Sequence, residues 1–324
     1  MLRRSLGASR RYLLNQLDRP AVILLYHRVT HLKNDPQLLS VTPENFYEQV
    51  SLLRKKYTLL KIEEFSDLIT RKKKIPRNAV VLTFDDGYAD NYQEALPILE
   101  SLNSQALFYI TTSNLDTNKE LWWDELERIF LCDAILPPSI DIAIRDKPYH
   151  FPTATVKERF DIYYAIHPLL KYTSIAERNK VISELQQWAG LSTEGRSTHR
   201  LVTIDELQKM NASAAAVIGA HTINHPALST LSYEEQLSEI CLSKAFLEKM
   251  LDKEVEHFSY PFGSKKDYNR NSIKACKESG FKIVCANYYN QAHSWTDIFQ
   301  VPRILVRNWD KPAFIQQLPK FFKY

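Results

Sequence analysis

The sequence predicts an α/β fold built around a parallel sheet. Three observations support this prediction: short apolar, β-branched runs recur along the chain, amphipathic stretches separate them, and polar residues with glycine follow several of the runs. The chain has 324 residues, of which 44% are hydrophobic and 11% aromatic. That composition is sufficient for a large core and too rich in aromatics for a disordered chain.

The apolar runs give the predicted strands, and helical periodicity gives the segments between them. The first helix is predicted from Phe46, Val50 and Leu53, which recur on one helical face, and Thr42 followed by Pro43 marks its beginning. Two more helices are predicted around 92–99 and 233–246. The predicted strands are 21–26, 79–84, 106–110, 215–220, 256–260, 281–286 and 301–306.

The alternation of strands and helices stops between about residues 112 and 202. This segment reads as helices only, and the clearest are 122–131, 155–171 and 174–189. We therefore predict a domain over residues 20–324 that carries a helical insertion at about 112–202, placed as a cap near the functional site.

Residues 1–19 form a basic N-terminal segment. It holds five arginines and one aspartate, which leaves 37 basic and 37 acidic residues in the remaining chain. A body without basic excess is a poor match for a phosphate backbone, so we expect no nucleic-acid partner. The segment also lacks the apolar core of a secretory signal, so we expect a cytoplasmic protein. Residues 2–19 give a weaker alternative, peripheral contact with the inner membrane face.

The chain has no apolar run long enough to cross a bilayer, which excludes a membrane-spanning protein at this stage. Its four cysteines show no C-x-x-C spacing and lie in apolar surroundings, which predicts buried free thiols. They are Cys132, Cys241, Cys276 and Cys285.

Two adjacent carboxylates, Asp85 and Asp86, follow the predicted strand 79–84 and precede Gly87. Aspartates at this position can simply cap the next helix. They can also bind a cation or carry proton chemistry, which would explain charges placed at the end of a hydrophobic strand. The segment alone leaves both interpretations open.

A pair of histidines favours the cation. His221 and His225 follow the predicted strand 215–220 and are four residues apart, a spacing at which both rings can face one metal. With one of the two aspartates they make a three-ligand site with open positions, typical of catalytic Zn²⁺, although Fe²⁺ or Co²⁺ would also fit. The second aspartate is then available to take a proton from water, which predicts a hydrolase.

These two motifs, Thr83-Phe84-Asp85-Asp86-Gly87 and His221-Thr222-x-x-His225, resemble the polysaccharide deacetylase family, also called the NodB-homology family or carbohydrate esterase family 4. The resemblance is expected to cover residues 20–110 and 200–310. It implies a distorted (β/α) barrel of about seven strands and metal-dependent removal of N-acetyl groups from an amino sugar. By position, it also implies that Asp85 is the general base and that Asp86, His221 and His225 bind the divalent metal.

The third motif of that family, R-x-P-Y, has Ser259-Tyr260-Pro261-Phe262 in its place. The resemblance implies that the backbone N–H of Phe262 binds the developing oxyanion, a role that needs no particular side chain. The family arginine that orients the base is missing, and serine is no substitute for a charged fork. We predict that Arg303 contacts Asp85 instead.

The family's C-terminal L-x-H motif is also missing, but Leu25-Tyr26-His27 ends the first predicted strand. In a closed barrel the first and last strands are neighbours, so the motif can change its place in the chain and keep its place in space. The sequence thus resembles circularly permuted members of the family, which implies that His27 is the general acid.

Other functions remain open at this stage. The enzyme could be an O-acetyl esterase, because an ester needs less protonation of its leaving group. The chain could also be a non-catalytic saccharide-binding protein that lost the motif arginine. Trp122 and Trp123 begin a predicted helix of the insertion, where packing is the favoured interpretation and contact with a sugar the alternative.

Overall fold

A computed structural model describes residues 19–131 and 133–322. The expectations for the basic N-terminal segment and for Cys132 lie outside these residues. Within them, no helix is both long enough and apolar enough to span a bilayer. The other three cysteines are free thiols, as predicted, but Cys241 is only partly buried, whereas Cys276 and Cys285 are fully buried.

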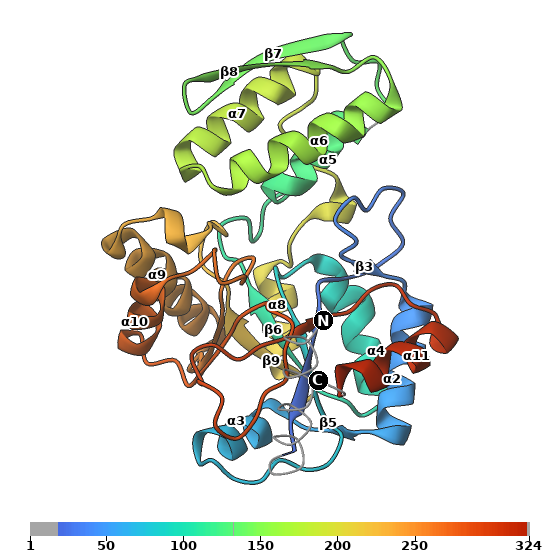
Figure 1. The fold of residues 1–324 in the computed structure, drawn as a ribbon, viewed down its shortest axis with the longest axis vertical. Helices are drawn as coiled ribbons and strands as arrows, with labels where there is room; N and C mark the ends of the chain where they lie inside the picture. Colours follow the sequence, from blue (N-terminus) through green and yellow to red (C-terminus); the bar gives the residue numbers. More distant parts are fainter. Residues whose placement is uncertain (1–18, 132, 323–324) are drawn as a thin grey trace, which may run out of the picture.

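A curled parallel sheet forms the centre of the molecule, as the sequence predicted (Figure 1). All seven predicted strands are present, and β4 (Thr58–Leu59) pairs with β5 outside the main order. The order is β11-β10-β9-β6-β5-β1-β12. Its strands are β1 (Ala21–Tyr26), β5 (Ala79–Phe84), β6 (Ala106–Ile110), β9 (Ala216–Ala220), β10 (His257–Ser259), β11 (Ile283–Cys285) and β12 (Ile304–Leu305).

The two ends of the chain meet in this sheet. β1 pairs in parallel with β12, with Leu24 opposite Ile304. A parallel bridge between Cys285 and Val301 links β11 to the segment that leads into β12, so the sheet curls almost into a closed barrel. The neighbourhood of first and last strands, on which the permuted arrangement depends, is confirmed.

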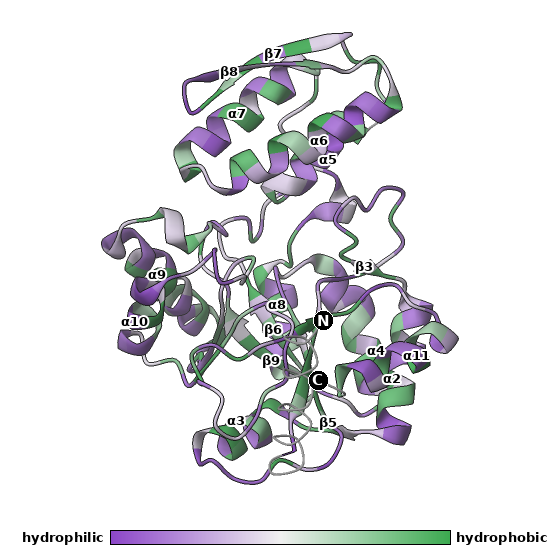
Figure 2. Cartoon of the chain, in the orientation of Figure 1, coloured by the Kyte–Doolittle hydropathy of each residue, from purple (hydrophilic) through white to green (hydrophobic). Residues whose placement is uncertain are grey.

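Alternate strand residues face two different cores. One set, with Val22, Val80 and Phe108, packs against the surrounding helices. The other set, with Ile23, Val81 and Leu107, fills the inside of the curl. Because side chains alternate along a strand, Thr83 and Asp85 point to the inside as Val81 does. Figure 2 shows the hydrophobic strands in the middle and the hydrophilic residues on the helices around them.

Helices surround the sheet, and most begin with a side-chain cap. Thr42 caps α2 by accepting from Asn45 N, and Pro43 is the first helical residue, as predicted. The helices of the barrel are α2 (Pro43–Lys56), α3 (Ile62–Thr70), α4 (Leu96–Ser101), α8 (Ile204–Ala212), α9 (Tyr233–Leu251), α10 (Arg270–Glu278) and α11 (Lys311–Phe321).

The insertion forms a separate layer over one end of the barrel (Figure 1). Its three predicted helices are present as α5 (Trp122–Leu131), α6 (Val156–Lys171) and α7 (Ile175–Trp188). The prediction of helices only is wrong, because β7 (Ser139–Ile144) and β8 (Lys147–Pro152) form an antiparallel hairpin. Its boundaries at about 112 and 202 stay a prediction.

Candidate metal centre and active site

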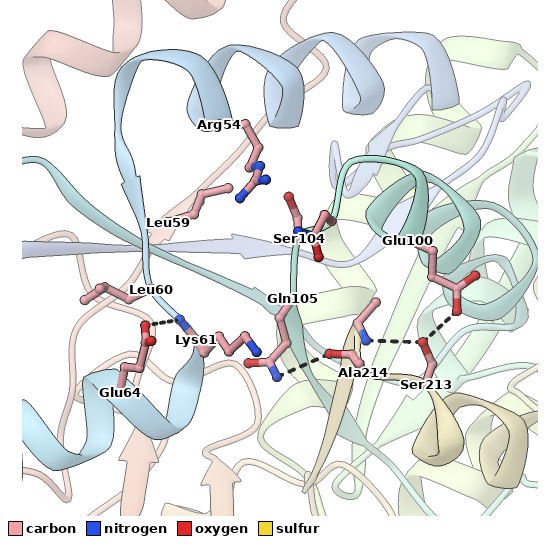
Figure 3. A pocket seen from close by; sticks show the side chains of 12 residues that line it. Arg54, Leu59, Leu60, Lys61, Glu64, Glu100, Ser104, Gln105, Ser213 and Ala214 are labelled. Carbon is pink, nitrogen blue, oxygen red and sulfur yellow. Dashed lines mark hydrogen bonds between the residues drawn. The ribbon is translucent and has the colours of Figure 1, made fainter.

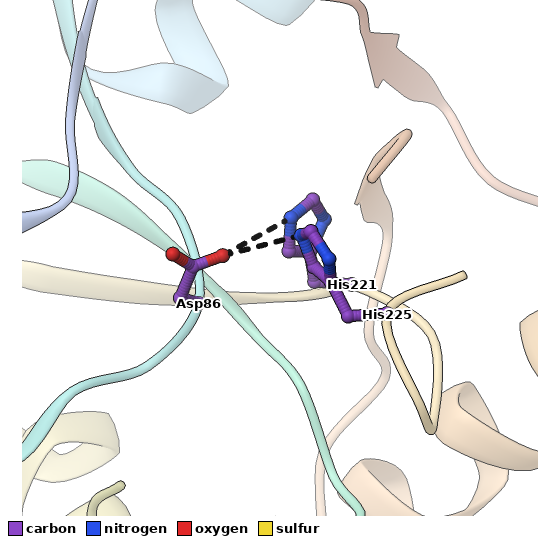
Figure 4. A group of neighbouring side chains, drawn as sticks. All are labelled: Asp86, His221 and His225. Atoms are coloured by element: carbon purple, nitrogen blue, oxygen red, sulfur yellow. Dashed lines mark ion pairs between the residues drawn. The ribbon is translucent and has the colours of Figure 1, made fainter. Parts of the chain in front are cut away.

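Three side chains at the carboxyl ends of β5 and β9 form one cluster. Asp86 Oδ1 lies 3.6 Å from His221 Nε2 and 3.4 Å from His225 Nε2. Figure 4 shows the carboxylate pointing between the two rings. Their potential ligand atoms all lie within 4.8 Å of one another, and all three residues are buried. The structure thus brings together the three predicted metal ligands.

The turns that carry these ligands depend on unusual backbone angles. Asp86 and Gly87 have φ values of 76° and 83°, so the chain reverses sharply after β5. Thr222 and His225 have φ values of 67° and 49°, which non-glycine residues seldom adopt. The Thr222 hydroxyl accepts a hydrogen bond from His225 N at 3.1 Å and helps to hold this turn.

Further side chains hold the same turn from outside. Glu239 on α9 accepts hydrogen bonds from the backbone N–H groups of Ile223 and Asn224 at 3.0 and 2.9 Å. Arg178 on α7 donates to the carbonyls of Asn224 and His225 at 2.8 and 3.4 Å. The turn that carries the metal ligands is therefore fixed by the barrel on one side and by the insertion on the other.

The protonation of the histidines suits a metal. His221 Nδ1 donates to the carbonyl of Ser259 at 2.7 Å, so Nε2 is free to accept and faces Asp86. Burial lowers the pKa of His221 to about 4 and that of His225 to about 3, so both rings are neutral at pH 7. Two neutral nitrogens and a carboxylate are a donor set that Zn²⁺, Co²⁺ and Fe²⁺ accept.

Asp85 is held by Arg303, as predicted from the sequence. The guanidinium donates from Nη1 to Oδ1 at 2.7 Å and from Nη2 to Oδ2 at 2.6 Å, and Arg303 is fully buried. Burial alone would raise the pKa of Asp85, but the charge of Arg303 outweighs it and holds this pKa well below its usual value. Asp85 is therefore ionised and fixed in orientation.

Ser259 occupies the position of the missing motif arginine and lies in the same network. Arg303 Nη2 donates to its hydroxyl at 2.6 Å, and that hydroxyl donates to Asp85 Oδ2 at 3.3 Å. The small serine on β10 thus takes part in the contact between Asp85 and an arginine that arrives beside β12. The expected contact is confirmed; its part in catalysis stays a prediction.

His27 joins the cavity from the end of β1. Its carbonyl accepts from Asn91 Nδ2 at 2.8 Å, and its Nδ1 is buried with no hydrogen-bond partner in the described part of the chain. Burial lowers its pKa, although the charges of Asp86 and Asp85 act in the opposite direction. A general acid needs a protonated ring, which the two carboxylate charges favour, but burial outweighs them.

A cavity of about 330 Å³ connects these groups. The barrel contributes the three metal-ligand candidates with His27, Asp85 and Phe262, and the insertion contributes Trp123, His167 and Lys171. The Phe262 ring lies 4.6 Å from that of His225. The oxyanion role predicted for the backbone N–H of Phe262 is untested.

Both tryptophans of the insertion are buried, with exposures of 7% for Trp122 and 4% for Trp123. Contacts with other residues cover most of their surface, which agrees with packing as the favoured interpretation of both residues. Trp123 nevertheless lines the cavity, and its ring lies 4.6 Å from that of His225. Contact of Trp123 with a sugar, the alternative interpretation, stays a prediction.

Sequence reasoning missed the cavity residues His167 and Lys171 and the turn-holding residue Arg178. A signal was present in each helix: His167 is in register with the apolar Tyr163 and Leu170, and Arg178 with Val181 and Leu185. A polar residue on an apolar helix face has to be explained by a partner, but the pattern does not say which one.

A larger cavity, of about 520 Å³, lies at the opposite, amino end of the strands (Figure 3). Several of its polar groups bind one another: Lys61 N donates to Glu64, Ser213 to Glu100, and Gln105 to the Ala214 carbonyl. It contains none of the clustered metal-ligand candidates. In parallel α/β folds, chemistry belongs at the carboxyl ends of the strands, so the smaller cavity is the candidate active site.

Comparisons with known proteins agree with this architecture. The model of the family described as polysaccharide deacetylase matches residues 72–131 and 180–284, about half of the chain. It reaches into both ends of the expected insertion, beyond the range over which we expected similarity, and leaves out residues 132–179 between them. It does not extend over residues 20–71 and 285–310, where we also expected similarity.

Curated relatives match the chain in part. YxkH of Bacillus subtilis (strain 168) is 21% identical over 262 residues, which are 81% of this chain and 62% of that protein. The poly-beta-1,6-N-acetyl-D-glucosamine N-deacetylase of Escherichia coli (strain K12) is 33% identical over 97 residues, 30% of this chain and 14% of that protein. The chain thus spans less than two thirds of the length of these relatives.

Solved structures share the fold. The deacetylase PplD of Streptococcus pyogenes, in complex with acetate, has a TM-score of 0.60 at 18% identity and covers 93% of this chain and 98% of its own. IcaB from Ammonifex degensii has a TM-score of 0.59 at 16% identity, with coverages of 93% and 97%. At these identities the likeness shows the fold alone.

Proposed function

The chain belongs to the polysaccharide deacetylase family, and on that premise we propose that it is a metal-dependent hydrolase that removes N-acetyl groups from an amino sugar of a saccharide or its precursor. The observation that carries this proposal is the juxtaposition of an ionised, arginine-held Asp85 with the cluster of Asp86, His221 and His225.

Asp86, His221 and His225 would hold the divalent ion, and Zn²⁺ is our proposal for its identity. When bound, such an ion supplies positive charge that polarises the acetyl carbonyl and acidifies water. The protein itself supplies a preformed ligand set, because the Nδ1 contact of His221 with Ser259 already orients one ring. Asp85 is fixed by its own partner, Arg303, and remains available for proton transfer.

We assign the proton transfers to two side chains. Water attacks the acetyl carbon and gives a proton to Asp85, while the backbone N–H of Phe262 donates to the carbonyl oxygen as it gains charge. The C–N bond then breaks, and the amine nitrogen takes a proton from His27, which yields acetate and a free amine. Burial lowers the pKa of His27 and favours its neutral form. Its ring therefore takes up a proton from solvent as negative charge develops beside it, and passes that proton to the amine. The proton held by Asp85 returns to solvent, which restores both side chains.

The state of His27 favours one second candidate, an O-acetyl esterase. An alkoxide leaving group needs less protonation than an amine, so a mostly neutral His27 would limit ester hydrolysis less. The non-catalytic alternative loses its main support, because its premise was a missing arginine and Arg303 occupies that place beside Asp85.

Acetate release from N-acetylated and O-acetylated saccharides, measured with the Zn²⁺-loaded protein, tests the proposal. We expect release from an N-acetylated oligosaccharide, and loss of it in Asp85→Asn with the metal content unchanged. Release from O-acetylated substrates alone would replace the proposal by the esterase. Asp85→Asn with near wild-type turnover would show that the base is assigned wrongly.

A further inference from the structure

The insertion contributes one wall of the catalytic cavity. His167 and Lys171 both line it and are four residues apart on α6, so they lie on the same helix face. The metal-ligand candidates and Phe262 line the same cavity from the barrel. A ligand within reach of the metal cluster would therefore also lie near α6.

His167 packs against two aromatic rings but has a polar atom without a partner among the described residues. Its ring lies 4.8 Å from the ring of Trp122 and 5.8 Å from that of Tyr163. Its Nε2 is buried and has no hydrogen-bond partner among residues 19–131 and 133–322. A buried polar atom without a partner is costly, and one that belongs to a cavity-lining side chain is available for a ligand.

Lys171, by contrast, already has a charged partner. Its ammonium lies 2.8 Å from Asp267 Oδ1 and 4.3 Å from the centre of the Phe262 ring. Tyr172 donates to the same carboxylate oxygen at 2.8 Å. This contact fastens the end of α6 to the loop after β10, and it leaves the α6 wall without an unpaired charge.

We propose that His167 is a substrate-binding residue, whose Nε2 forms a hydrogen bond with a hydroxyl of an uncharged N-acetylated amino sugar lying between α6 and the metal cluster. The inference rests on the proposed function and adds to it a substrate-binding residue and a preference for an uncharged sugar. The ion pair of Lys171 with Asp267 is a positioning contact that keeps α6 against the barrel. Since that charge is paired, a hydroxyl fits this wall better than a phosphate or carboxylate.

The test uses the Zn²⁺-loaded full chain and a β-1,6-linked N-acetylglucosamine oligomer. In His167→Phe, an aromatic ring still packs between Trp122 and Tyr163 but cannot form the hydrogen bond. We expect KM to rise about tenfold, the value of one hydrogen bond, with kcat within about threefold of wild type. His167→Asn, which keeps a donor and an acceptor, should recover part of the loss.

His150→Ala is the matched control, because His150 lies on β8 of the same insertion, is exposed, and pairs with the exposed Asp141. It should leave KM unchanged. Thermal unfolding and metal content exclude misfolding as the cause of a change.

Three results would overturn the inference. If the wild type is active and His167→Phe has the same KM, the inference is wrong but the proposed function stands. The same holds if N-acetylglucosamine 1-phosphate inhibits the wild type more tightly than N-acetylglucosamine does. A wild type that releases acetate from no acetylated saccharide overturns the proposed function, and the inference with it.

Discussion

At the scale of single residues, the central feature is an arginine that acts from a different strand. The family motif would place the arginine at position 259 on β10, but Ser259 stands there and Arg303 reaches Asp85 from beside β12. The curled sheet permits this, because both positions face the same interior. A bidentate contact depends on the planar guanidinium, which lysine cannot reproduce.

Arg303→Met should therefore damage both folding and catalysis. It leaves the Asp85 carboxylate buried without its partner, which typically costs about 3–5 kcal/mol of unfolding free energy. Denaturant unfolding measures this loss, and the double variant with Asp85→Asn should recover a substantial part of it, because no charge is then left unpaired. Additive effects of the two substitutions would show that the pair is not coupled.

His27→Ala gives a prediction that separates the two bond types. Loss of a general acid typically lowers kcat by about 10²–10⁴-fold, and an amide needs the acid more than an ester does. We therefore expect a much larger loss on an N-acetylated than on an O-acetylated substrate. Equal losses on both would remove the role of His27 as the acid for the leaving amine.

At the scale of elements, the barrel was predictable and the hairpin was not recognised. Strands β1, β5 and β6 are buried on both faces, so they read as unbroken apolar runs that end at the observed residues. The hairpin carried a signal of another kind: Ile140, Ile142 and Ile144 alternate with polar or small residues. In the turn after them, Arg145 and Asp146 have positive φ values. Neither residue type is a strong sequence signal for a hairpin turn.

Only those site residues that belong to sequence motifs could be predicted from the sequence. The spacing of the aspartates and histidines shows which groups meet, since strand ends in one sheet meet at one edge. His167 and Arg178 depend on how the insertion lies over the barrel, and no local pattern specifies that placement. Their partners are residues or ligands far away in the sequence.

Arg178 tests the link between the insertion and the metal centre. It is 4% exposed and donates to the two carbonyls that flank the strained His225. Because outer contacts of this kind typically change metal affinity by 10–100-fold, Arg178→Ala should weaken Co²⁺ binding by about that factor, measured by the absorption of the bound ion. Lys180→Ala, on the same helix and exposed, should bind as the wild type does. Unchanged affinity in Arg178→Ala would mean that the insertion does not support the ligands.

At the scale of the whole molecule, burial of histidines makes the fold sensitive to acid. Burial lowers the pKa of His167, His221 and His257 to about 4, of His225 to about 3 and of His199 to about 2. Below about pH 6.5, these histidines become protonated in the unfolded chain, whereas in the folded chain they stay neutral down to their lowered pKa values. The stability that comes from these groups is therefore complete above pH 6.5 and falls as the pH drops.

Each such histidine should contribute about 1.4 kcal/mol per pH unit between pH 6.5 and its folded pKa. Urea unfolding of the metal-free protein at several pH values measures the slope. His257→Leu removes a buried histidine outside the catalytic cavity and should reduce the slope by about one proton. A slope that is unchanged in this variant would show that His257 is not the source of acid sensitivity.

The candidate site combines residues from both ends of the chain with residues from its middle. His27 follows β1, Arg303 precedes β12, and the aspartates and histidines come from β5 and β9, so the site exists only when the barrel is closed. The account depends on this convergence around one ion.

Titration of metal-free protein with Zn²⁺, followed by acetate release from an N-acetylglucosamine oligomer, tests that claim most directly. We predict no release before addition, a linear rise and a sharp limit at one equivalent, with Asp86→Ala lacking the rise. Full release by chelator-treated protein, or a rise that Asp86→Ala retains at the same equivalence, would contradict it.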